Sequence, residues 1–155
     1  MKVMTLILLV KDDQILLAQK KRGFGKGHWN GAGGKVEPGE TIEQAMIREC
    51  QEEIMVTPRN YEQVARHTFE VHYNGAPETL EVHAFISDTW TGEPTETEEM
   101  RPQWFSKQDI PYKNMWQDDT YWLPRVLAGK KVVGHFTFDD QDKMLTHKIQ
   151  EVDSL

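Results

Sequence analysis

The sequence contains a single cysteine, Cys50, and no apolar stretch long enough to cross a membrane. One cysteine excludes a framework of disulfides within the chain, so we expect a reducing, cytoplasmic location and assign Cys50 to the core. The apolar run at residues 3–10 is too short for a transmembrane helix, and no small-residue cleavage site follows it. Internal repeats and low-complexity tracts are also missing. The sequence therefore predicts one domain, residues 1–155, without membrane contact.

Basic residues are in deficit, because 18 Lys and Arg stand against 25 Asp and Glu, for a net charge of −7. Proteins that bind polymeric nucleic acids usually carry a basic surface, so we expect no such partner. A small nucleotide is compatible with this charge, since a divalent cation can bridge acidic side chains and phosphates. The 38% apolar content is typical of a globular domain, which we expect to be a monomer.

The apolar pattern predicts more strands than helices, which favours the α/β class with a mixed sheet. Helix signals occur at residues 41–54, where Thr41 and Gln44 form a capping box, and from Asp118 to Gly129, where Pro124 should disturb the turns. Strands are predicted at residues 3–10, 14–20, 61–73, 79–90, 101–106, 132–138 and 143–152, with a short additional strand ending at Val36.

The first predicted helix carries three glutamates and one arginine within residues 48–53. At about 100° per residue, Glu49 and Glu53 fall in the middle of the stripe formed by the apolar residues of this helix. Buried unpaired charge costs several kcal/mol or more, and one Arg cannot neutralise three Glu, whereas a divalent cation would. The alternative is a solvated acidic face with an Arg48–Glu52 pair, but the polar Gln44 and Gln51 lie on the opposite side.

This segment resembles the Nudix box: Gly34, five residues, Glu40, seven residues, then Arg48-Glu49-Cys50-Gln51-Glu52-Glu53. The resemblance implies a Nudix-type α/β/α sandwich with a mixed β-sheet and two main helices, which uses magnesium (or manganese) to hydrolyse nucleoside diphosphate derivatives. It also implies a metal site and a catalytic group, made of Glu49, Glu52, Glu53 and the carbonyl of Gly33, with Arg48 orienting the glutamates and Glu53 or Glu52 activating water. Met55 departs from the pattern, because the family usually has glycine there, which makes the helix exit an open question.

Two neighbouring segments offer phosphate contacts. Backbone N–H groups of the stretch Gly31-Ala32-Gly33-Gly34-Lys35 can bind phosphate oxygens, although glycines more often mark close backbone packing. Strand alternation points Lys20 to the same face as Ala18 and Leu16, which makes Lys20 the better phosphate ligand, and Lys21 and Arg22 are expected to be solvated.

Asp118 and Asp119 lie side by side at the start of the second predicted helix. Acids in this place normally cap the helix and interact with its dipole. Two close carboxyl groups can also share a proton, and would then present both a donor and an acceptor to a purine edge. The adjacent Trp116 either stacks on such a base or belongs to the core.

Residues 20–25, 29–36, 100–105 and 115–122 resemble the MutT-like branch of the Nudix family, and the similarity extends over nearly the whole chain. This implies hydrolysis of oxidised purine nucleoside triphosphates, 8-oxo-dGTP first and 2-hydroxy-dATP also, to the monophosphate and pyrophosphate, which removes mutagenic nucleotides. By this resemblance, the base is hydrogen-bonded by Asn30, Asp118 and Asp119, and its faces are lined by Phe24, Phe69, Met100 and Trp116. The border of the pocket is formed by Thr5 and Lys20. Glu99 would add one more carboxylate to the metal site. Gln117, which we count among the substrate-binding residues, stands where proline is expected, and Val71 stands where an aromatic residue is expected.

Other functions are compatible with the same box. It can serve ADP-ribose, dinucleoside polyphosphates or NADH, because it handles phosphates and not the base, but residues 115–122 argue against this. A non-catalytic nucleotide-binding or RNA-cap-binding module would be expected to lose acidic ligands, and all are present. An acidic interaction domain with a fortuitous motif would not match so many positions.

Overall fold

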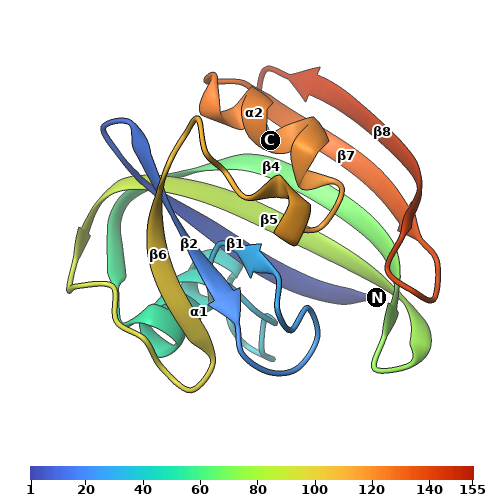
Figure 1. The fold of residues 1–155 in the computed structure, drawn as a ribbon, viewed down its shortest axis with the longest axis horizontal. Helices are drawn as coiled ribbons and strands as arrows, with labels where there is room; N and C mark the ends of the chain where they lie inside the picture. Colours follow the sequence, from blue (N-terminus) through green and yellow to red (C-terminus); the bar gives the residue numbers. More distant parts are fainter.

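The computed structural model describes residues 1–155, which form one eight-stranded sheet with a helix on each side (Figure 1). The helices are α1 (Ile42–Ile54) and α2 (Asp119–Leu127), with one turn of 3-10 helix, η1 (Tyr112–Asn114). The strands are β1 (Lys2–Lys11), β2 (Gln14–Lys20), β3 (Trp29–Asn30), β4 (Thr57–Tyr73), β5 (Ala76–Thr91), β6 (Met100–Ser106), β7 (Lys131–Phe138) and β8 (Met144–Val152).

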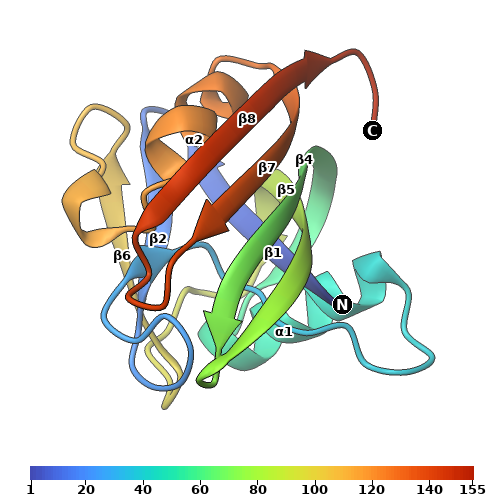
Figure 2. The same cartoon turned by 90° about the vertical axis from the view of Figure 1, so that its right-hand side faces the viewer.

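The sheet is mixed, as predicted. Its order is β3-β2-β1-β5-β4-β7-β8, and β6 pairs with β2. The β1–β5 and β4–β7 pairs are parallel, and the other pairs are antiparallel. Strand β8 lies at the outer edge beside β7, as Figure 2 shows.

Strand β1 shows how the sheet lies between two apolar cores. Its residues Leu6 and Leu8 belong to the apolar cluster that contains Trp122 of α2, whereas Ile7 and Leu9 belong to the cluster that contains Met46 of α1. Successive side chains of a strand point to opposite faces, so β1 is buried on both sides and reads as one apolar run. The sheet therefore separates two cores, and the predicted α/β/α sandwich is confirmed.

Helix α1 begins and ends with recognisable caps. The Thr41 hydroxyl accepts from the Gln44 N–H, and the Gln44 side chain accepts from the Thr41 N–H, which completes the predicted capping box. At the other end, Met55 adopts the left-handed conformation (φ 63°, ψ 34°) and donates its N–H to the Gln51 carbonyl. The helix exit typical of glycine is thus retained with a methionine, at a cost of roughly 1–2 kcal/mol.

Some sequence predictions were wrong. No regular strand ends at Val36, because the chain there forms only isolated bridges, Met4 with Lys35 and Ile7 with Ala32. Strand β3 was not predicted, since two residues are too short to show a period. Pro124 lies inside α2, which continues through it to Leu127.

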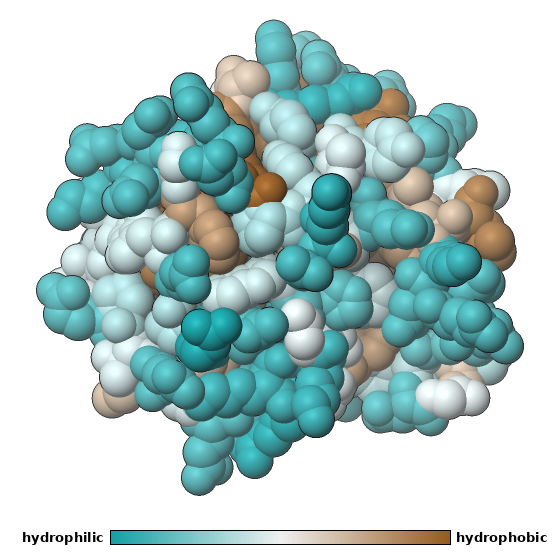
Figure 3. All heavy atoms as spheres, viewed as in Figure 1, coloured by the Kyte–Doolittle hydropathy of each residue, from teal (hydrophilic) through white to brown (hydrophobic).

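No helix is both long and apolar enough to span a bilayer. The face of the molecule in Figure 3 is mostly hydrophilic, with apolar residues in small separate areas.

Candidate functional site

The chain segment of residues 31–34, which we call the glycine turn, packs directly on β1. A Cβ atom at Gly33 would lie 1.9 Å from the Thr5 carbonyl oxygen, and one at Gly31 would lie 2.4 Å from the Ile7 carbonyl oxygen. At Gly34 it would lie 2.5–2.7 Å from the carboxyl atoms of Glu49. These glycines are therefore required for close approach of the backbone to β1 and α1.

Glu49 and Glu53 contact this turn, and Glu52 and Glu99 are linked to them through Arg48 and Lys20. We call Glu49, Glu52, Glu53 and Glu99 the carboxylate cluster. Arg48 holds two of them: its Nη1 atom donates to Glu49 (2.9 Å) and to Glu52 (3.2 Å). The same guanidinium forms two hydrogen bonds with Glu40, 2.7 and 2.9 Å long, and a third with the Lys35 carbonyl. Arg48 thus ties α1 to the loop that precedes it.

Glu53 is the buried member of the cluster, only 3% exposed. Its Oε1 atom accepts the N–H of Gly33 at 2.8 Å, so α1 and the glycine turn are joined at this residue. Burial raises the pKa of Glu53 to about 7, against the Gly33 hydrogen bond and the nearby Lys20, which lower it. Burial also raises the pKa of Glu49, although Arg48 opposes the shift. The inward phase predicted for Glu49 and Glu53 is confirmed by this burial.

Lys20 lies between Glu53 and Glu99 of the carboxylate cluster. Its Nζ atom lies 3.5 Å from Glu53 and 3.7 Å from Glu99, so it faces inward, as strand alternation predicts. Arg22 is exposed to solvent, as expected, and its Nε atom also donates to Glu99 at 2.9 Å. This hydrogen bond is the main reason why the pKa of Glu99 lies below its usual value. Cations of the protein contact these carboxylates, and no group of three acidic, His or Cys side chains is arranged to hold a metal ion.

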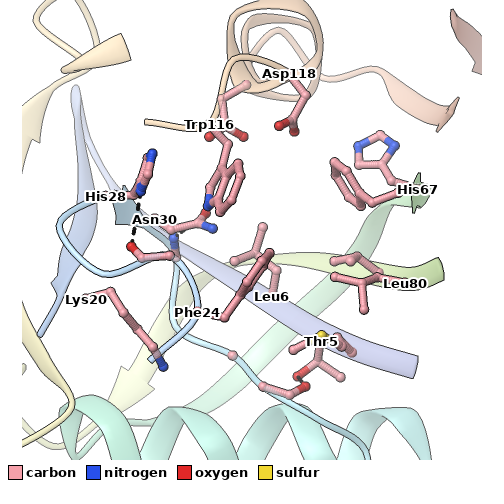
Figure 4. Close-up of a pocket in the computed structure, with 18 of the residues that line it drawn as sticks. Thr5, Leu6, Lys20, Phe24, His28, Asn30, His67, Leu80, Trp116 and Asp118 are labelled. Atoms are coloured by element: carbon pink, nitrogen blue, oxygen red, sulfur yellow. Dashed lines mark hydrogen bonds between the residues drawn. The ribbon is translucent and has the colours of Figure 1, made fainter. Parts of the chain in front are cut away.

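A cavity of about 150 Å³ begins at Lys20 and Glu53 and extends between the sheet and α2. Figure 4 shows its labelled side chains, from Thr5 and Lys20 beside α1 to Trp116 and Asp118 at the start of α2. Apolar side chains of β1, β4 and β5 form much of its wall, among them Leu6, Phe69 and Leu80. The cavity is therefore a mainly apolar chamber that opens onto the charged cluster.

Asp118 and Asp119 lie at the α2 end of this chamber and are only 2% and 3% exposed. Asp118 makes no capping bond, and its Oδ2 atom accepts from the Trp122 indole at 2.8 Å. Oδ1 of Asp118 and Oδ2 of Asp119 have no partner. Burial raises the pKa of Asp118 to about 7 and that of Asp119 well above its usual value, the second helped by the charge of Asp118.

Stacked aromatic rings, those of Phe24, His28 and Trp116, form one wall of the cavity. Trp116 stacks on Phe24, with ring centroids 5.1 Å apart, and on His28, with centroids 4.7 Å apart. Phe24 also contacts Tyr73 at the tip of β4, at 4.9 Å. A flat ligand placed beside Trp116 would meet π-faces there and hydrogen-bonding groups at the acid pair.

The structure brings together most of the residues predicted from the sequence. Those that line the cavity are Thr5, Lys20, Phe24, Asn30, Gly33, Gly34, Glu53, Phe69, Met100, Trp116, Asp118 and Asp119. Ala32, Lys35 and Gln117 do not line it; the side chain of Gln117 turns outward and accepts the N–H of Met144 at 2.6 Å. The N–H groups of Gly31 and Gly33 are already bonded, to Asn30 and Glu53.

Sequence reasoning missed other lining residues, which include Met4, Leu6, Gly25, His28, His67, Leu80, Val82, Trp122 and Phe138. Alternation along β4 could have identified His67, because it lies two residues before Phe69 on the same face. His28 and Gly25 belong to a loop without period, and the sequence holds no signal for them.

Comparisons with known proteins agree with this geometry. A family model described as the NUDIX domain matches residues 1–126. An oxidized purine nucleoside triphosphate hydrolase of Mus musculus is 48% identical over 153 residues, which cover 99% of this chain and 97% of that protein. A protein of the same description from Danio rerio is 46% identical, with coverage of 99% and 97%.

Among solved structures, a MutT protein from Bacillus halodurans superposes with a TM-score of 0.85 at 25% identity, covering 97% of this chain and 98% of that chain. The region that the NUDIX family model matches, residues 1–126, contains the glycine turn, α1 and the acid pair of Asp118 and Asp119. The chain therefore belongs to the Nudix family of hydrolases.

Proposed function

We propose that this protein hydrolyses oxidised purine nucleoside triphosphates, with 8-oxo-dGTP and 2-hydroxy-dATP as substrates, to the monophosphate and pyrophosphate. The two full-length relatives described as oxidized purine nucleoside triphosphate hydrolases support this proposal. The structural observation that carries it is the continuous cavity, which joins an aromatic chamber with two buried acids to Lys20 and Glu53. Removal of mutagenic nucleotides before polymerases use them is the role that follows.

In this proposal the base lies in the chamber. Because burial keeps the pKa of Asp118 at about 7 and that of Asp119 above its usual value, the acid pair retains a proton near neutral pH. A protonated carboxyl donates and its neighbour accepts, so the pair can match a purine edge that offers both groups. Asn30 adds an amide, and Phe24, Phe69, Met100 and Trp116 contact the faces of the ring.

The carboxylate cluster fits a divalent cation. Its donors are the oxygens that Mg²⁺ prefers, and the Gly33 N–H bond to Glu53 places residue 33 beside them. We assign Glu49, Glu52, Glu53, Glu99 and the carbonyl of Gly33 as the ligands, with Mg²⁺ as the cofactor and Mn²⁺ as a substitute. When bound, the metal would neutralise phosphate charge and make water more acidic.

The remaining roles belong to the side chains themselves. Arg48 holds Glu49 and Glu52 in place through its Nη1 atom and keeps the loop at Glu40 attached to α1. Lys20, at the junction of cluster and cavity, contacts the phosphate chain. Residues 31–35 border that chain, and of these Gly31, Gly33 and Gly34 line the cavity. Glu53 or Glu52 accepts the proton of the attacking water. Most of the catalysis is positioning and charge stabilisation, as is usual for phosphoryl transfer.

The test is pyrophosphate release with Mg²⁺ across oxidised triphosphates, dGTP, dATP, ADP-ribose and a dinucleoside polyphosphate. We expect the oxidised triphosphates to give the highest kcat/KM. Faster turnover of ADP-ribose or the dinucleoside polyphosphate would contradict the proposed substrate class, and no turnover of any compound would contradict the proposed activity.

Variants separate the two halves of the site. Glu53→Gln should abolish turnover and leave the fold largely intact, whereas Glu43→Gln, on the exposed side of the same helix, should be active. Asp119→Asn should reduce the preference for 8-oxo-dGTP over dGTP more than it reduces metal binding. Equal preference in variant and parent would remove the acid pair from base recognition. We also propose a cytoplasmic monomer, which size-exclusion chromatography with light scattering and cell fractionation would test.

A further inference from the structure

His67 is a buried polar residue in the wall of the cavity with nothing to bond to. It lies on β4, is 1% exposed, and neither Nδ1 nor Nε2 has a hydrogen-bond partner. Its ring packs among three aromatic rings, with centroids 4.7 Å from Trp122, 5.2 Å from Phe136 and 5.9 Å from Phe69. A buried polar group without a partner costs about 1–3 kcal/mol. An apolar residue would be the more stable choice for this position, so the imidazole needs another reason.

The position of His67 relates it to the acid pair. Figure 4 shows it on β4, on the side of the cavity where Asp118 lies. Trp122 connects the two, because its indole contacts the His67 ring and donates to Asp118. The buried polar atoms without partners that line this cavity are the two nitrogens of His67, Oδ1 of Asp118 and Oδ2 of Asp119. All of them belong to its α2 end.

The neighbouring strand makes room for the imidazole. In the parallel β4–β7 pair, His67 stands opposite Gly134, and a Cβ atom at position 134 would lie 2.6 Å from Nδ1 of His67. The Nδ1 edge of the ring therefore faces β7, and both nitrogens are buried. A half-turn about the Cβ–Cγ bond exchanges the nitrogen and carbon edges of an imidazole in nearly the same space. That rotation turns the Nδ1 edge away from β7, to the side of β5, where Val82 pairs with His67 and lines the cavity.

His67 is uncharged, which suits a neutral ligand. Burial lowers the pKa of His67 to about 3, so the ring is uncharged at physiological pH. A neutral imidazole offers one N–H donor and one acceptor nitrogen. It can therefore bond either an oxo group or an amino group of a base.

We propose that His67 is a specificity-determining residue, whose ring nitrogen hydrogen-bonds the oxo or amino group that a purine presents beside the acid pair. A methyl group on that substituent removes the hydrogen bond and occupies the space, so His67 disfavours bases methylated there. The inference rests on the proposed function, because it assumes that the chamber holds a purine. It adds a recognition group from the sheet to those supplied by the start of α2.

The test compares two nucleotides that differ by methylation of the exocyclic oxygen, guanine and O6-methylguanine. Three variants separate hydrogen bonding from packing. His67→Leu removes both nitrogens, His67→Asn places an amide near the position of Nδ1, and His67→Gln places one near that of Nε2. Dissociation constants of the two nucleoside monophosphates are measured by calorimetry, and kcat/KM of the two triphosphates by pyrophosphate release. Thermal unfolding reports on the fold.

We expect His67→Leu to lower the preference for the unmethylated base about fivefold or more, the size of one neutral hydrogen bond. The Asn or the Gln variant should keep that preference within about twofold of the parent, and the one that does identifies the nitrogen. Equal effects of all three variants on both nucleotides would show a purely structural residue and overturn the proposal. A parent that binds both monophosphates but hydrolyses none of the oxidised purine triphosphates would contradict the proposed function only, because the binding ratio still tests His67. A parent that binds neither would overturn the inference as well.

Discussion

Replacement of Asp118 by Asn should stabilise the protein at alkaline pH and leave it unchanged at acidic pH. Asp118 is buried, and burial raises its pKa from 3.8 to about 7. The folded protein therefore binds this proton more tightly than the unfolded chain does. The resulting stability is fully present below pH 3.8 and is lost as the pH rises through about 7. A shift of this size corresponds to about 4 kcal/mol of unfolding free energy.

Asparagine retains the carbonyl oxygen that can accept from Trp122, but it cannot ionise. Urea unfolding of parent and variant at pH 4 and pH 8 gives the difference between them at each pH, so groups that do not interact with Asp118 cancel. Asp119 does interact with it, and loss of the Asp118 charge removes a repulsion between the two acids, which acts in the same direction at pH 8. We expect a difference near zero at pH 4 and up to about 4 kcal/mol in favour of Asp118→Asn at pH 8. Asp153→Asn, at an exposed position, is the control and should show no such change. An Asp118→Asn difference that is the same at both pH values would refute the account of the acid pair.

Three further substitutions test the helix and the turn. Met55→Gly should raise the unfolding free energy by about 0.5–1 kcal/mol in urea titrations, because glycine adopts the left-handed conformation without strain; a loss of stability would contradict the strain. Arg48→Lys should lower kcat more than tenfold, since a lysine cannot contact Glu40 with two parallel hydrogen bonds and still reach the cluster; normal kcat would remove Arg48 from its positioning role. Gly34→Ala should lower kcat at least tenfold without unfolding the protein, because its Cβ atom displaces the Glu49 carboxyl group; an unchanged kcat would show that the position of Glu49 is unimportant.

The sequence was sufficient for the parts of the fold that repeat regularly. The period of α1 placed Glu49 and Glu53 on its inner side, and the structure buries Glu53 beside Gly33. The continuous apolar run of β1 reflects burial on both faces of the sheet. Capping of α1 by Thr41 was also predicted, because a capping box is a local pattern of four residues.

Non-local contacts limited the rest. Strand β3 exists because two residues pair with β2, and no period can reveal so short an element. The Arg22–Glu99 hydrogen bond joins residues 77 positions apart, so no local pattern pairs them. His67 looks like an ordinary strand residue until the parallel register places it opposite Gly134 and beside Trp122. Gln117 was predicted to contact the substrate, a role that stays a prediction, and its side chain is engaged with β8.

The carboxylate cluster as a divalent-metal site is the central claim, and direct titration with a metal tests it most simply. Calorimetric titration of the protein with Mn²⁺ or Mg²⁺, in the presence of a nucleoside monophosphate, should show saturable binding that Glu53→Gln strongly weakens and Glu43→Gln leaves intact. Absence of metal uptake by the parent, or equal uptake by the parent and Glu53→Gln, would contradict the account.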